Sequence, residues 1–172
     1  MFVIRKNLTN NADAFVLRPF TKKDIPYVRE LHKNLYSIER KLSSDIFDKY
    51  IDESITAFVD EYNTEKDCMF MLEYYGRLAG SIAVKHSDNK IAQLRFFLIE
   101  PEARDIGAGR KMLDLIMNFC REKGYEHIFL WTISDQKVAR HLYNSYGFQI
   151  THTQENHEWG TDVIEERWDL NL

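Results

Sequence analysis

Residues 104–110, Arg-Asp-Ile-Gly-Ala-Gly-Arg, have the composition of a loop that binds an anion. Glycine at 107 and 109 lets the backbone turn, so that successive N–H groups and the N-terminus of a following helix converge on one point. Arg104, Arg110 and the lysine after it add positive charge. The spacing differs from the dinucleotide fingerprint and from the nucleotide P-loop, which makes ATP a poor fit. Because glycines before a helix also serve steric needs, a purely structural loop is the alternative.

Two polar side chains interrupt the apolar run 91–99, which is otherwise typical of a buried strand. Gln93 and Arg95 would face either a cleft or an internal hydrogen-bonding partner, and both interpretations stay open. Strict alternation predicts one face with Ala92, Leu94, Phe96 and Leu98, and the other with Ile91, Gln93, Arg95, Phe97 and Ile99.

Tyr143 lies near the end of an apolar helix pattern over residues 137–146, one turn after the small Ala139. A phenol has an ordinary pKa of about 10 and can donate its proton to a stronger base. Tyr143 is therefore a candidate general acid, and an ordinary core tyrosine is the alternative.

The elements that must position these residues follow from hydrophobic periodicity and turn signals. A strand over 14–18 precedes a helix that begins around Thr21, where Asp24 completes a capping pattern, and a second helix follows Ser44. The remaining pattern predicts strands over 68–74, 78–85, 91–99, 128–132, 148–153 and 164–170, with helices over 109–123 and 137–146. This order predicts an α+β or α/β fold, with helices on the faces of a sheet and an antiparallel meander in its middle.

Length and composition predict one domain over residues 1–172, with 1–13 as a polar N-terminal extension. Of the 172 residues 44% are apolar, and the net charge of −4 argues against a nucleic-acid-binding protein. Cys68 and Cys120 lie in apolar stretches without metal-ligand spacing, so we expect buried thiols and no metal site. Since no apolar run reaches the length of about 18 that spans a bilayer, we expect a cytoplasmic protein without a membrane partner.

Two motifs in this order resemble those of the GNAT superfamily of acetyl-coenzyme A dependent N-acetyltransferases. They are the run 104–110 after the strand 91–99, and His-Leu-Tyr-Asn-Ser-Tyr-Gly-Phe over 141–148. The resemblance covers residues 68–172 well and 14–66 loosely. It implies a mixed, mostly antiparallel sheet of about six or seven strands flanked by about four helices.

A narrower resemblance is to the acetyltransferase domain of bacterial MarR/GNAT fusion proteins. It rests on Ala-Gln-Leu-Arg at 92–95, Leu-Trp-Thr at 130–132, Ala-Arg-His-Leu-Tyr at 139–143 and Trp-Asp-Leu at 168–170. No winged-helix pattern precedes these residues, so we expect no direct contact with DNA.

The resemblance implies an enzyme that moves acetyl from acetyl-CoA, its cosubstrate, to a primary amine by direct attack. The pyrophosphate would rest on the backbone of residues 104–110, and the pantetheine would lie beside the strand 91–99. Backbone N–H groups near Leu98 would hold the oxyanion, and Tyr143 would protonate the departing thiolate. The residues expected to contact the cofactor are Leu98, Ile99, Arg104, Asp105, Ile106, Gly107, Ala108, Gly109, Arg110, Gln136, Ala139 and Tyr143.

The attacking amine must lose a proton, which costs on the order of 4 to 5 kcal/mol at pH 7 for a lysine-like amine. Many relatives place a glutamate on this strand, where Gln93 stands here and cannot act as a base. Glu73, Glu39, His32 and His157 are the remaining candidates, acting directly or through water. Each also has an ordinary structural interpretation, as a strand-edge charge, a solvated acid, or a core or surface histidine.

We expect the acceptor pocket where the first two helices and the loop 157–160 meet the sheet. Its candidate residues are His32, Tyr36, Gln93, Arg95 and His157. The acidic net charge favours an amine-bearing acceptor, and small metabolites, antibiotics, polyamines and protein amines all stay open. The terminal strands offer an edge that could pair two copies into a homodimer.

Two departures from the family pattern bear on function. Asp105 stands where relatives usually have glycine or a basic residue, and its carboxylate would repel a pyrophosphate unless it turned outward or paired with Arg104. Gln136 replaces a common asparagine, a change that we expect to be tolerated. Because Gln93 and Asp105 weaken two chemical positions, a non-catalytic CoA-binding or regulatory module is the alternative function. A third hypothesis is a partner of a MarR-type regulator that acts through protein contacts.

Overall fold

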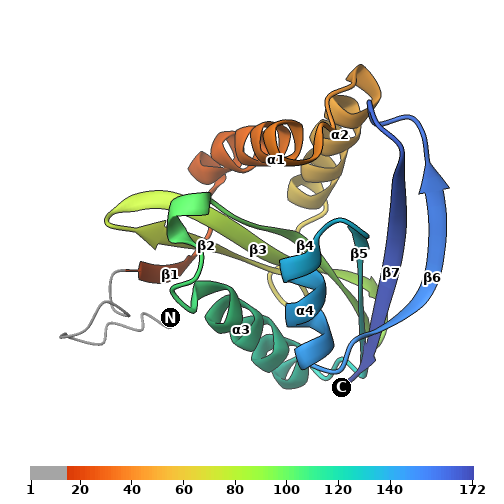
Figure 1. Ribbon diagram of the computed structural model, residues 1–172. Helices are drawn as coiled ribbons and strands as arrows, with labels where there is room; N and C mark the ends of the chain where they lie inside the picture. Colours follow the sequence, from red (N-terminus) through yellow and green to blue (C-terminus); the bar gives the residue numbers. More distant parts are fainter. Residues whose placement is uncertain (1–14) are drawn as a thin grey trace.

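The structure, a computed structural model, describes residues 15–172, and the predicted extension 1–13 lies outside them. Its seven-stranded sheet has the order β1-β2-β3-β4-β5-β7-β6, and all neighbours are antiparallel except β4 and β5 (Figure 1). The elements are β1 Phe15–Pro19, α1 Ile25–Arg40, α2 Asp45–Asp60, β2 Cys68–Tyr74, β3 Arg77–Asp88, β4 Ile91–Ile99, α3 Ala108–Glu122, β5 His127–Ile133, α4 Lys137–Ser145, β6 Gln149–Asn156 and β7 Val163–Asn171. The predicted mixed sheet with four helices is confirmed.

Helices α1 and α2 cover one face of the sheet, and α3 and α4 cover the other (Figure 1). Alternation along the strands supplies both layers, because successive side chains point to opposite faces. Met71 and Ala83 belong to the core under α1 and α2, whereas Leu72 and Ile82 belong to the core under α3. Cys68 and Cys120 are buried free thiols, as predicted, and lie in the core under α3.

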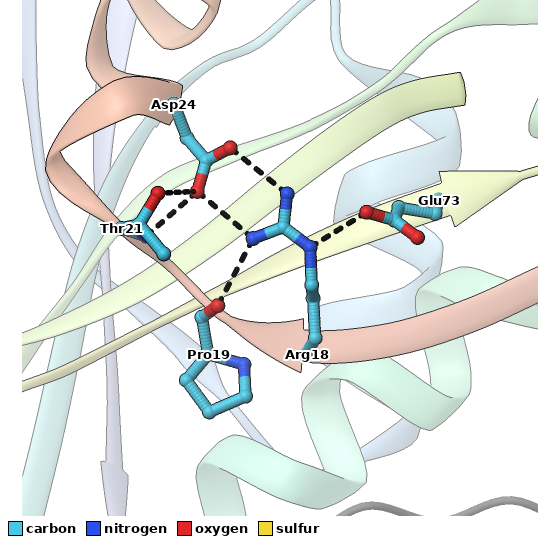
Figure 2. A network of polar contacts seen from close by, with 5 residues as sticks. All are labelled: Arg18, Pro19, Thr21, Asp24 and Glu73. Atoms are coloured by element: carbon cyan, nitrogen blue, oxygen red, sulfur yellow. Dashed lines mark hydrogen bonds and ion pairs between the residues drawn. The ribbon is translucent and has the colours of Figure 1, made fainter. Parts of the chain in front are cut away.

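A polar network fixes the start of α1 against the edge of the sheet (Figure 2). Asp24 accepts two hydrogen bonds of 2.9 Å from the Arg18 guanidinium, whose Nε also donates to Glu73 at 2.6 Å. The backbone N–H of Thr21 donates to Asp24 at 2.7 Å, which completes the capping box predicted from the sequence. Charged hydrogen bonds of this kind are the strong ones, so the network holds β1, β2 and α1 in register.

The predicted alternation of side chains along β4 is wrong beyond Arg95, because the strand contains a bulge. Phe96 has a φ of 51°, and the pairing with β3 is irregular between the partners Ser81–Leu98 and Ala83–Arg95. An extra residue at a bulge reverses which face the following side chains take. Phe96 therefore packs with the core under α1 and α2, on the same side as Arg95, whereas Phe97 and Ile99 turn to the α3 and α4 side.

The parallel strands β4 and β5 separate after a short stretch of pairing. Their pairs are Ile91–His127, Ala92–Ile128 and Gln93–Phe129, and beyond Gln93 the two strands no longer share hydrogen bonds. The rest of β5 stays paired with β7 as far as Ile133 and Glu165. The carboxyl-terminal halves of β4 and β5 therefore diverge and open a gap in the middle of the sheet.

Candidate active site

A cavity of about 420 Å³ occupies the gap between β4 and β5. Its walls come from both layers of the molecule, since α1, α2 and α4 all contribute side chains. The residues that line it include His32, Tyr36, Phe47, Tyr50, Gln93, Arg95, Phe96, Leu98, Gln136, Ala139, Tyr143, Trp159 and Glu165. The cavity volume falls within the range of about 300 to 1,000 Å³ typical of small-ligand sites.

The loop between β4 and α3 leads directly into the N-terminus of a long helix. Gly107 has a φ of 82° and caps α3, in a backbone conformation that favours glycine. Gly109 packs beside β4, where a Cβ would be in ordinary van der Waals contact with Ile99 Cδ1 at 3.4 Å. The N–H groups of the first turn have no acceptor within the helix. The segment therefore combines a glycine turn with a helix N-terminus, the arrangement on which the prediction of an anion site at residues 104–110 depends.

Arg104 and Asp105, which are neighbours in this loop, have opposite surroundings. The Arg104 guanidinium donates to the Ile99 carbonyl at 2.9 Å and forms an ion pair of 2.8 Å with Glu39. Asp105 is exposed, has a φ of 60°, and forms no ion pair with any residue of 15–172. Arg104 pairs with Glu39 instead of Asp105, so the expected neutralisation of Asp105 by Arg104 is absent and its exposed carboxylate keeps its charge beside the α3 N-terminus.

Tyr143 lies in the wall of the cavity with Ala139, one helical turn before it. Its ring is buried against Phe97, Phe148 and Trp168, with ring centroids 5.9 to 6.4 Å apart. Burial, and in second place the neighbouring Tyr36, raises the pKa of Tyr143 above its ordinary value. The phenol is therefore protonated at neutral pH and can donate a hydrogen bond into the cavity.

A buried carboxylate holds the helix of Tyr143 against β7. Glu166 accepts hydrogen bonds from Arg140 Nε at 2.9 Å and from Trp168 Nε1 at 3.0 Å. Gln136, at the start of the same helix, accepts a hydrogen bond of 3.1 Å from Arg40 of α1. The amide expected to contact the cofactor thus joins α4 to α1 in this structure.

The structure brings four of the five predicted acceptor-binding residues together. His32, Tyr36, Gln93 and Arg95 line the cavity, and burial raises the pKa of Tyr36 to about 12. His157 does not line it. Its ring is exposed and lies 2.8 Å from Asp162 and 3.3 Å from Glu155, and the hydrogen bond with Asp162 raises its pKa.

Of the four predicted proton acceptors, His32 alone lines the cavity. Glu73 belongs to the Arg18 network and Glu39 is paired with Arg104, and neither carboxylate lines the cavity. His32 does, and its Nδ1 lies 2.7 Å from the Val28 carbonyl, which assigns the proton to Nδ1 and leaves Nε2 as an acceptor. Burial, with a smaller contribution from Arg95, lowers the pKa of His32 to about 4.

Glu165 is a cavity residue that the sequence reading missed. Its side chain, in a residue that is only 9% exposed, accepts hydrogen bonds from the amide groups of Gln154 and, at 2.8 Å, Asn156. Because Glu166 points to the α4 side, the alternation of β7 turns Glu165 to the side of α1 and α2. The signal was present in the sequence, as the adjacent acids Glu165 and Glu166 inside the predicted strand 164–170.

Comparison with known proteins decides the family. The sequence profile of the acetyltransferase (GNAT) family matches residues 30–148. The chain belongs to this family. YjgM of Escherichia coli (strain K12), an uncharacterized N-acetyltransferase, is 25% identical over 137 residues, which cover 78% of this chain and 81% of YjgM. The protein is therefore an acetyltransferase enzyme, as predicted.

Solved structures share the fold of this GNAT family member. An acetyltransferase from Streptococcus agalactiae 2603 has a TM-score of 0.75 at 19% identity, over 92% of this chain and 99% of that one. The structure of yncA from Salmonella typhimurium with its cofactor acetyl-CoA has a TM-score of 0.70 at 16% identity, over 92% and 94% of the two chains. GNAT acetyltransferases use acetyl-CoA and act on amines.

No group of three or more His, Cys, Asp or Glu side chains among residues 15–172 is arranged to hold a metal ion. None of the helices in that range is both long and apolar enough to cross a membrane.

Proposed function

We propose that this protein transfers the acetyl group of acetyl-CoA to a primary amine by direct attack on the thioester. The observation that carries the proposal is the cavity in the gap between β4 and β5, whose lining includes Leu98 near the end of β4 and Tyr143 of α4. A cofactor whose pyrophosphate rests on the α3 N-terminus can extend along β4 into this gap. An amine in the cavity then meets the thioester beside Leu98 and Tyr143.

In the proposed step the amine nitrogen bonds to the acetyl carbonyl carbon, and the carbon–sulfur bond breaks. The nitrogen loses a proton to an acceptor, and the sulfur gains one and leaves as the free thiol of CoA. Backbone N–H groups at the β4 bulge, near Leu98, stabilise the oxyanion, because a bulge leaves part of the ladder unpaired. Tyr143 donates the proton to sulfur. Burial of its ring raises its pKa, so the phenol still carries that proton when the reaction begins.

We assign Glu165 as the proton acceptor, directly or through a bridging water. It is a carboxylate in the cavity wall, and its two hydrogen-bond partners are neutral amides that leave its charge in place. His32 is the second candidate through its free Nε2, although the pKa of about 4 makes it a weaker base. Glu73 and Glu39 are assigned structural roles, since both are bound to arginines.

The test is thiol release from acetyl-CoA over a panel of primary amines, with initial rates measured at varied concentrations of both substrates. Direct attack predicts intersecting double-reciprocal lines, whereas parallel lines would indicate a covalent acetyl-enzyme. Tyr143→Phe should lower kcat by about a hundredfold and leave acetyl-CoA affinity unchanged. Binding of acetyl-CoA without turnover of any amine would instead favour the non-catalytic module.

We extend the proposal to the setting of the enzyme. The buried free thiols of Cys68 and Cys120 support a reducing, cytoplasmic compartment. β6 forms one edge of the sheet and its side chains are largely exposed, which supports pairing of two copies into a homodimer. The narrower likeness to bacterial MarR/GNAT fusion proteins stays a prediction from the sequence.

A further inference from the structure

One side of the cavity is a wall of aromatic rings from α1, α2 and the loop after β6. Trp159 stacks on Tyr50 with centroids 5.3 Å apart and meets the edge of Phe47 at 5.4 Å. Tyr36 contacts Phe47 from the other side at 5.5 Å. Such a wall favours an acceptor with an aromatic or bulky apolar group, because it offers a large, rigid, apolar surface.

Arg95 brings an unneutralised positive charge to the same cavity. Its guanidinium lies 5.0 Å from the ring centroid of Phe96. No carboxylate of residues 15–172 forms an ion pair with it, in contrast to Arg18, Arg29, Arg104, Arg140 and Arg167. The nearby ring of His32 is held neutral, so it does not compete for an anion. A guanidinium in a cavity wall is suited to bind a carboxylate through two parallel hydrogen bonds.

A negative charge lies in a different wall of the cavity. Glu165 comes from β7, across the gap from the β4 strand that carries Arg95. Its partners Gln154 and Asn156 orient the carboxylate without neutralising it. The cavity therefore offers a cation from β4 and an anion from β7, with the aromatic wall alongside them.

We propose that the acceptor is a free amino acid with an aromatic or bulky apolar side chain. Arg95 binds its carboxylate, Glu165 faces its ammonium group, and its side chain lies on the rings of Tyr36, Tyr50 and Trp159. This inference rests on the proposed function and names its substrate class. A polyamine has no carboxylate for Arg95, and neither has the amino group of a lysine side chain in a protein.

The experiment compares L-phenylalanine with 2-phenylethylamine, which differs from it by the carboxylate alone. We measure kcat/KM for both compounds with the wild type, Arg95→Gln and Arg95→Lys. The matched control is Arg77→Gln, since Arg77 is exposed at the start of β3 and does not line the cavity. Comparing ratios between variants cancels the difference in basicity between the two amines.

We expect Arg95→Gln to lower kcat/KM for phenylalanine by about ten- to a hundredfold, mainly through KM, and to change the value for phenylethylamine less than about threefold. Arg95→Lys should fall between, because it keeps the charge and loses the paired hydrogen bonds. Arg77→Gln should match the wild type. An equal loss for both compounds in Arg95→Gln, or a wild-type preference for phenylethylamine that Arg95→Gln leaves unchanged, would overturn the inference.

A binding measurement separates this inference from the proposed function. N-acetyl-L-phenylalanine, the expected product, is titrated calorimetrically into the wild type and Arg95→Gln. If neither amine is acetylated but the product binds about tenfold more tightly to the wild type, the carboxylate site stands and the catalytic proposal fails. If phenylethylamine is acetylated and N-acetyl-L-phenylalanine binds equally to both proteins, catalysis stands and the carboxylate site is wrong.

Discussion

The charges of individual side chains decide what the loop before α3 and the cavity can bind. In the loop before α3, Arg104 is held by Glu39 and by the Ile99 carbonyl, so its charge is largely engaged by the protein. Asp105 is exposed beside the same helix N-terminus. Attraction for a pyrophosphate must therefore come from the backbone N–H groups of the first turn and from Arg110, against the opposing charge of Asp105.

Replacing Asp105 by asparagine tests that opposition. Asparagine removes the charge and tolerates the positive φ of 60° about as well as aspartate. Two unit charges about 4 Å apart in water interact by about 1 kcal/mol, so Asp105→Asn should tighten acetyl-CoA binding about fivefold at low salt. Calorimetric titration measures this gain, which should shrink in 0.5 M salt, a concentration at which the Debye length is only about 4 Å.

Glu122→Gln is the matched control for Asp105→Asn. It removes one negative charge at the far end of α3, where Glu122 is exposed. Equal tightening by both variants would show that net charge, and not the position of Asp105, governs affinity. No tightening by Asp105→Asn at low salt would mean that the pyrophosphate does not lie near this loop.

The buried ring of His32 predicts a pH dependence of stability. Its pKa is about 4 in the folded protein, against about 6.5 in an unfolded chain. The unfolded chain therefore binds the proton more readily, and the stabilisation is complete above pH 6.5 and lost as the pH falls toward 4. The loss attributable to His32 should be about 3 kcal/mol. Urea unfolding from pH 7 to pH 4 measures it.

His32→Gln supplies the comparison, because it removes the titrating group and keeps a polar side chain of similar length. The exposed His157 has a raised pKa and titrates with the opposite sign, so only the difference between wild type and variant isolates His32. Parallel pH profiles for the two proteins would contradict the assignment of a buried, neutral His32.

At the scale of elements, β4 shows which features of a strand its sequence pattern predicts and which it does not. The predicted strand 91–99 matches the observed bounds Ile91–Ile99, and the alternation holds as far as Arg95. It fails after Phe96, where the backbone takes a positive φ that phenylalanine seldom adopts. The bulge depends on the fit to β3, where a Cβ on Gly80 would come within 2.6 Å of the Leu98 carbonyl oxygen. Nothing in the local residues signals it.

The same distinction explains which parts of the candidate site could be predicted. The loop 104–110 and the helix around Tyr143 are continuous segments, so their residue types and spacing can be read from the sequence alone. Glu165 acquires its place through Gln154 and Asn156 of the neighbouring strand. The pair of Glu39 with Arg104 joins an acceptor-side helix to the cofactor loop. Such contacts depend on tertiary pairing, which a single sequence does not encode locally.

Helix α1, which contributes His32 and Tyr36 to the cavity, begins at the Arg18 network. This network predicts the effect of Asp24→Asn on stability. The hydrogen bonds from Arg18, above all, lower the pKa of Asp24 to about 2. A carboxylate with a lowered pKa stabilises the fold above pH 4, and this contribution is lost as the pH falls toward 2. Asp24→Asn should lower the free energy of unfolding at pH 7 by about 2 kcal/mol and should lack that acid loss. Chemical unfolding at pH 7 and pH 3 measures both.

Asp52→Asn is the control for this prediction. Asp52 also pairs with two cations, Arg29 and Lys33, but its side chain is 44% exposed. Exposed ion pairs contribute about 0 to 1 kcal/mol, so this variant should be nearly as stable as the wild type. Equal destabilisation by the two substitutions would show that the burial of Asp24 carries no special weight.

At the scale of the whole molecule, the separation of β4 and β5 connects the two layers. The N-terminus of α3 lies in the layer opposite α1 and α2 (Figure 1). In the proposed function, the gap between the strands lets a cofactor from one side meet an acceptor from the other. Side chains of α1, α2 and α4 share the cavity that results. The edge strand β6 lies away from this gap, at the end of the sheet.

This arrangement predicts where acetyl-CoA protects the backbone. Hydrogen exchange is followed by mass spectrometry on the wild type with and without acetyl-CoA, an experiment that requires no knowledge of the acceptor. Exchange should slow by about tenfold or more in residues 96–110 and in the first turns of α4, and should stay unchanged in β6. Absence of protection at saturating acetyl-CoA, or protection confined to segments away from β4 and α3, would contradict a cofactor site in the gap between β4 and β5.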